Sequence, residues 1–82
     1  METRTAIIAI ILKNSDAAEA VNALLHTYAD YIIGRMGIPH RGRGLNLISI
    51  AIDAPQDIIN TLAGKIGRLS GVEAKTVYAP ND

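Results

Sequence analysis

The stretch 31–53, YIIGRMGIPHRGRGLNLISIAID, decides the fold because it holds two strand-forming segments joined by a short turn. In its second half, β-branched residues recur at every second position, as in a strand with one buried face: Ile48, Ile50 and Ile52. Residues 31–38 form the other segment. Pro39 lacks a backbone donor, and the two glycines that follow permit positive φ, so we expect a turn over residues 39–44.

This turn is basic, and no acidic residue falls between Asp30 and Asp53. A glycine-containing basic turn can hold a phosphate or another anion through backbone N–H groups and guanidinium groups. The predicted ligand-binding residues are Arg35, His40, Arg41, Gly42, Arg43 and Gly44. The arginines would hold an anionic group, the histidine would add a polar contact, and the glycines would let the ligand approach the backbone. The alternative is a solvated hairpin tip whose charges only keep the protein soluble.

The remaining segments complete a pattern of alternating strands and helices. Residues 5–12, TAIIAIIL, read as a buried strand, and residues 16–29 as a helix that begins with a capping box of Asp16 and Glu19. A second helix is expected after Pro55, followed by a strand over residues 72–79 and a tail over 80–82. The order β-α-β-β-α-β predicts one α+β domain over residues 1–82 with a ferredoxin-like fold. Its four-stranded antiparallel sheet would carry both helices on one face.

The composition of the chain argues against several classes of function. The chain has 82 residues, no cysteine, zero net charge and 49% apolar residues. Zero net charge argues against a dedicated nucleic-acid binder, although the RGRG fragment at 41–44 leaves that module as a third candidate. No apolar run reaches the roughly 20 residues that span a bilayer, and the first residues do not resemble a secretory signal. We therefore expect a cytoplasmic protein that does not associate with membranes.

Both faces of the predicted sheet are apolar, which predicts a homo-oligomer, either a dimer or a tetramer. The face assigned to the helices carries Ile8, Ile10, Leu12, Met36, Ile38, Ile48, Ile50 and Ile52. The opposite face carries Ile7, Ala9, Ile11, Ile33, Leu47, Ala51 and Val77. A monomer would expose this second set as an apolar patch that is large for a soluble protein, so another subunit is expected to cover it.

Three segments resemble the small proteins named as regulators of the iron-only hydrogenase system. They are VNALLHTYADYIIGRMGIP at 21–39, LISIAID at 47–53 and LAGKIGRLSGVEAKTVYA at 62–79. The resemblance implies an ACT-like, ferredoxin-like fold that is similar to the effector-binding domain of the nickel-responsive repressor. It also implies a stand-alone regulatory or sensor module that oligomerises and is associated with hydrogenase maturation. Independently of the resemblance, we expect a small effector or a partner protein to bind at the subunit junction near residues 35–44.

Two differences limit what the resemblance implies about ligands. The loop at 13–16, KNSD, lacks the glycine at which many ACT domains meet an amino-acid effector. The nickel-responsive domain uses several histidines and a cysteine, whereas here cysteine is absent and His26 and His40 lie on different elements. No metal site and no cofactor are predicted.

The sequence contains no arrangement typical of a catalytic site. No serine stands in a Ser-His-Asp pattern, and the paired carboxylates at 16/19 and 53/57 are accounted for by helix starts. We therefore expect a protein that is not an enzyme. The main alternative to a regulator is a ligand-free structural subunit of a larger complex, with an interface on the helix face that bears Lys65 and Arg68.

Overall fold

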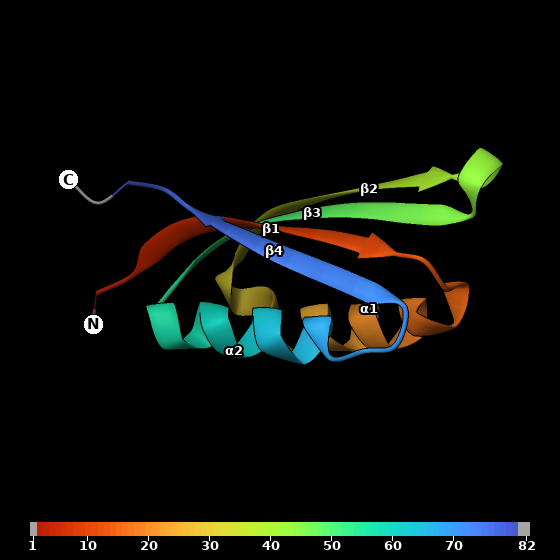
Figure 1. Ribbon diagram of the computed structural model, residues 1–82. Helices are drawn as coiled ribbons and strands as arrows, with labels where there is room; N and C mark the ends of the chain where they lie inside the picture. Colours follow the sequence, from red (N-terminus) through yellow and green to blue (C-terminus); the bar gives the residue numbers. More distant parts are fainter. Residues whose placement is uncertain (1, 81–82) are drawn as a thin grey trace.

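The computed structural model describes residues 2–80, and it has the predicted order of elements (Figure 1). The elements are β1 (Arg4–Leu12), α1 (Ala18–Thr27), β2 (Ile32–His40), β3 (Leu45–Ala54), α2 (Gln56–Gly67) and β4 (Val72–Tyr78). The strands form one antiparallel sheet in the order β2-β3-β1-β4, and both helices cover the same face of it. The ferredoxin-like prediction is confirmed. Beyond Pro80, the expected tail lies outside the described residues.

The core lies between the sheet and the two helices. Strand β1 shows why: its even positions from Ala6 to Leu12 are buried and its odd positions are exposed, as a period of two requires. Fully buried side chains from β3, α1 and α2 complete the core, and they include Ile50, Ile52, Val21, Leu25, Ile59, Leu62 and Ile66. Within residues 2–80, neither helix is long and apolar enough to cross a membrane.

Strand β2 corrects one part of the predicted sheet. Met36 and Ile38 were expected to face the helices, and this was wrong: Met36 pairs with Ser49, Ile38 pairs with Leu47, and they are 58% and 50% exposed on the opposite face. The physical reason is a β-bulge. The pairing register shifts between Ile32 and Gly34, and one extra residue in a strand moves all later side chains to the other face.

The start of the first helix also differs from the prediction. The side chain of Asn14, rather than that of Asp16, provides the cap, because Asn14 Oδ1 accepts a hydrogen bond from the Asp16 backbone N–H at 2.9 Å. This cap opens a short 3-10 turn over Ser15–Ala17 that leads into α1. In the hairpin turn, Gly44 has a positive φ of 66°, whereas Gly42 lies in a 3-10 turn without one. Of the two glycines in the turn, only Gly44 therefore meets a backbone requirement for glycine.

Candidate functional site

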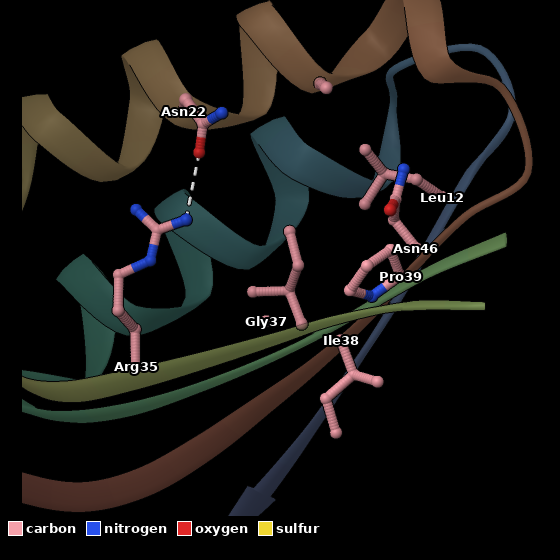
Figure 2. A pocket seen from close by; sticks show the side chains of 9 residues that line it. Leu12, Asn22, Arg35, Gly37, Ile38, Pro39 and Asn46 are labelled. Atoms are coloured by element: carbon pink, nitrogen blue, oxygen red, sulfur yellow. Dashed lines mark hydrogen bonds between the residues drawn. The ribbon is translucent and has the colours of Figure 1, made fainter. Parts of the chain in front are cut away.

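Strand β2 is an edge strand whose consecutive residues point to opposite sides of the sheet. After the bulge, Arg35 and Gly37 pair with Ile50 and Ile48 and face the helices. Ile38 points the other way, away from α1 (Figure 2). Beyond the bulge, Arg35 therefore points toward α1, whereas Met36 and Ile38 point away from the helices.

A hollow of ≈ 220 Å³ lies between α1 and the β2–β3 hairpin, and we call it the helix-side hollow (Figure 2). It is lined by Leu12, Ala18, Asn22, Arg35, Gly37, Ile38, Pro39, Asn46 and Ile48. Arg35 is the single charged residue among them, and no carboxylate lines the hollow. The lining thus combines one cation and two amide side chains with an apolar remainder.

The exposed side chain of Arg35 contacts the first helix. Its Nη2 donates a hydrogen bond of 2.9 Å to Oδ1 of Asn22, which is the only hydrogen-bond partner of the guanidinium among residues 2–80 (Figure 2). A guanidinium has five N–H donors in a planar fork, so the remaining donors are free to bind an anion. The hydrogen bond to Asn22 orients the guanidinium before any ligand arrives.

Gly37 keeps the helix-side hollow open. It faces the helices, and a Cβ atom built on it would meet no heavy atom within 4 Å. Any other residue at this position would project its side chain into the space that the hollow now occupies. Glycine is therefore tolerated here without being required by the backbone, and its effect is to leave room beside Arg35.

A second, more open hollow adjoins the first at Pro39 and Asn46, and we call it the tip hollow. It is lined by Lys13, Asn14, Ser15, Pro39, His40, Arg41, Gly44, Leu45 and Asn46. Three of these residues are basic, namely Lys13, His40 and Arg41, and none is acidic. Glu73 lies nearby, with its carboxylate 3.8 Å from Nζ of Lys13. The two hollows form a basic surface that runs from α1 to the hairpin turn.

Four of the predicted ligand-binding residues line these hollows: Arg35 in the first, and His40, Arg41 and Gly44 in the second. Gly42 and Arg43 are exposed and line neither. A Cβ at Gly42 would sit 3.5 Å from Cε1 of His40, which is an ordinary contact, so close packing does not require glycine there. Only part of the basic turn therefore lines the hollows, and Gly42 and Arg43 lie outside them.

The sequence reasoning missed the amide residues of the site, Asn22 and Asn46, and it also missed Gly37. Asn22 is 13 positions from Arg35 in the chain and belongs to a different element. No local pattern marks either asparagine, because both are ordinary polar residues on the surface of a helix or strand. Only the packing of α1 beside the hairpin brings them to Arg35.

The two histidines lie apart. His40 lines the tip hollow, and His26 lines a separate depression on the other side of Arg35, next to Asn22 and Ala29. Within residues 2–80, no group of three or more His, Cys, Asp or Glu side chains is arranged to hold a metal ion.

Fold and lining together place the chain in the class of small ferredoxin-like α+β domains with a basic hollow beside an edge hairpin. A family model described as "TM1266-like: Iron-only hydrogenase system regulator, putative" matches residues 4–76. The chain therefore belongs to this TM1266-like family. None of the curated proteins compared with the chain matches it.

Solved structures support the same placement. The structure of the uncharacterised protein TM1266 from Thermotoga maritima has 35% sequence identity and a TM-score of 0.92, and the match covers 96% of this chain and 100% of that one. A formyltetrahydrofolate deformylase from Pseudomonas putida KT2440 has 19% identity and a TM-score of 0.66. That match covers 95% of this chain and 29% of the deformylase, so it shows a shared fold and nothing about activity.

Proposed function

We propose that this protein is a small regulatory module, and not an enzyme, that self-associates in the cytoplasm and binds a small anionic effector in the helix-side hollow. The family name points to the iron-only hydrogenase system as the process regulated. The observation that carries the proposal is the geometry of Arg35. Its guanidinium is held by Asn22 beside a partly apolar hollow that no carboxylate lines.

The lining of the hollow indicates the chemistry of the effector. One guanidinium with free donors suits a carboxylate or a phosphate, which it can bind through two parallel hydrogen bonds. The Asn22 and Asn46 amides would bind further polar groups, and Leu12 and Ile48 would contact a short apolar part. Since the tip hollow adds His40 and Arg41, an effector with a second anionic group would extend in that direction. Amino acids, 2-oxo acids and inorganic phosphate are therefore the probes of choice.

The proposal is tested by binding those probes to the wild type and to two matched variants. Arg35→Gln removes the charge inside the helix-side hollow, whereas Arg43→Gln removes the same charge from outside both hollows. Hydrogen bonds to a charged group contribute about 1.5–3 kcal/mol, so Arg35→Gln should weaken binding roughly 10- to 100-fold in calorimetric titration. Arg43→Gln should bind as the wild type does.

Two results would count against an effector site. One is equal loss of affinity in both variants, which would reveal a diffuse attraction to positive charge and not a specific site. The other is the absence of any thermal shift with every probe, together with native mass spectra that show no bound mass on freshly purified protein. The second result would favour a ligand-free structural subunit, whose proposed interface includes Lys65. In the isolated chain, Nζ of Lys65 already contacts the Tyr28 hydroxyl at 3.2 Å.

A further inference from the structure

The sheet face opposite the helices is apolar and uncovered, and we call it the open face. Seven large side chains on it are between 36% and 67% exposed: Ile7, Ile11, Ile33, Met36, Ile38, Leu47 and Val77. Together they expose on the order of 600 Å² of apolar surface. That area is at the upper end of the patches on monomers and approaches the roughly 800 Å² that each partner buries in a standard interface.

The strand register arranges this face in three rows across the sheet. The rows are Gly34-Ala51-Ile7-Val77, Met36-Ser49-Ala9-Lys75 and Ile38-Leu47-Ile11-Glu73. Their charged members, Lys75 and Glu73, both lie on the edge strand β4. The centre of the open face therefore carries no charged side chain. Such a charge-poor centre with charges at the rim is typical of protein interfaces.

The open face also has two hollows separated by a ridge, a shape that a second copy of the same face can fit. One hollow of ≈ 240 Å³ has the small residues Ala9 and Ser49 in its lining, together with Met36, Ile38 and Leu47. A second hollow of ≈ 300 Å³ lies toward the other end of β1, beside Thr5 and Ala79. Along β1, Ile7 stands between Thr5 and Ala9, so Ile7 and its neighbour Val77 form a ridge that separates the two hollows. A ridge beside a hollow allows two identical faces to interdigitate.

Association through the strand edges would not cover the apolar open face. The edge strand β2 contains Pro39 and a bulge, both of which disrupt a ladder with a further strand. Pairing through β4 would extend the sheet and leave the open face exposed to water. The chain carries zero net charge, so two copies do not repel each other at long range.

We propose that the open face packs against the open face of a second copy, sheet on sheet, around a two-fold axis that runs across the strands near Met36. In this arrangement Ile7 of one copy lies over Ile11 of the other, and the reverse, while Met36 meets its own counterpart at the axis. The β4 edge, with Lys75 and Glu73, lies at the rim of the interface. The two sheets lie about 10 Å apart, as in sandwiches. The inference rests on the self-association in the proposed function and specifies its surface. The helix-side hollow is on the opposite side of the sheet, so each copy keeps its own effector site.

The first experiment measures mass in solution by sedimentation equilibrium. The wild type should have at least twice the chain mass of 8.7 kDa. Leu47→Lys and Ile11→Lys place a charge in the paired face and should each weaken association more than tenfold. Ala20→Lys adds the same charge on the exposed surface of α1 and should keep the wild-type mass. A monomeric wild type, or wild-type mass in both Leu47→Lys and Ile11→Lys, would overturn the proposal.

The second experiment tests that the same face meets itself. Met36 lies close to the proposed axis, so Met36→Glu and Met36→Lys should each be monomeric because like charges would oppose each other. An equimolar mixture of the two should associate again. Met36 is 58% exposed in the isolated chain, so these variants should remain folded by circular dichroism. If the mixture stays monomeric, the proposed two-fold pairing is wrong.

Failure of this inference can be told apart from failure of the effector proposal. Both proposals are measured on the same variants, with mass in solution for one and probe affinity for the other. Leu47→Lys should lose association while keeping wild-type affinity for any probe that binds the helix-side hollow. Loss of both properties in a folded Leu47→Lys would show that the effector site needs the partner copy, contrary to the arrangement proposed.

Discussion

The two sides of the β2–β3 hairpin differ sharply although the same short segment of β2 builds both. Arg35 and Gly37 face α1, where a charged side chain meets amides around an open space. Met36 and Ile38 face the other way and contribute to the apolar open face. The comparison teaches that one strand can serve two surfaces of opposite chemistry, because its side chains alternate every residue. An edge strand that only one layer covers makes this possible.

The largest expected effect comes from comparing two neighbouring isoleucines in β1. Ile8 is fully buried against the helices, whereas Ile7 is 49% exposed on the open face. Ile8→Ala should lower the free energy of unfolding by about 2–5 kcal/mol, because it removes buried methyl groups and leaves a cavity. Ile7→Ala should cost less than about 1 kcal/mol in dilute, monomeric protein, mainly through strand propensity. Urea unfolding followed by circular dichroism measures both.

The effect of protein concentration on stability should also differ between the two isoleucine variants. If two open faces pair, the wild type should become more stable as concentration rises, since association favours the folded state. Ile7→Ala should reduce that gain and Ile8→Ala should not. Equal losses for the two variants at every concentration would contradict the difference between the two faces.

A second pair of variants separates the two surfaces by function. Gly37 and Gly34 lie on opposite sides of β2, and a Cβ at either position meets no heavy atom within 4 Å. Gly37→Val should fill the helix-side hollow and abolish probe binding while leaving mass in solution unchanged. Gly34→Val should weaken association by about 1–3 kcal/mol, because added bulk forces the paired faces apart, and should leave probe affinity unchanged.

The free energy of unfolding provides the control for Gly37→Val and Gly34→Val. Replacing a strand glycine without a steric clash should change the free energy of unfolding by no more than about 1 kcal/mol, and in the stabilising direction. If Gly37→Val lost association, or Gly34→Val lost probe binding, the two sides of the hairpin would not be independent surfaces.

The smallest expected effect concerns pH and lies at the other end of β3. Side-chain hydrogen bonds from Thr3 and Thr5 lower the pKa of Asp53 below its ordinary value of 3.8; Thr5 Oγ1 donates at 2.8 Å. A lowered pKa in the folded state means that the ionised carboxylate stabilises the fold above the unfolded pKa. This contribution is lost as pH falls through the lower folded pKa.

Unfolding of the wild type and of Asp53→Asn between pH 2 and pH 7 tests this linkage. The difference in stability between them should be constant near neutral pH and should shrink below about pH 4. The effect is small because Asp53 is only partly buried, so that solvent screens its charge. A difference that stays unchanged down to pH 2 would show that the threonine hydrogen bonds do not favour the ionised form.

The sequence by itself determined the number, type and order of the elements, and with them the ferredoxin-like fold. Helical and strand periodicities are local, so β1 and β3 could be assigned from residues within a few positions of each other. The alternation also identified six members of the open face correctly in β1, β3 and β4, as well as Ile33 at the start of β2. The family resemblance likewise depends on residues that are contiguous in the chain, and the family model confirms it.

Only the tertiary structure decided which way Met36 and Ile38 point, because a bulge that depends on pairing with β3 shifts the alternation by one residue. It also decided the composition of the candidate site. Arg35 meets Asn22 because α1 packs beside the hairpin, whereas Arg43 in the 3-10 turn is exposed and lines neither hollow. A local pattern carries no information about contacts between elements. Those contacts are set by how the helices cover the sheet, and here they separate the basic side of the hairpin from the apolar one.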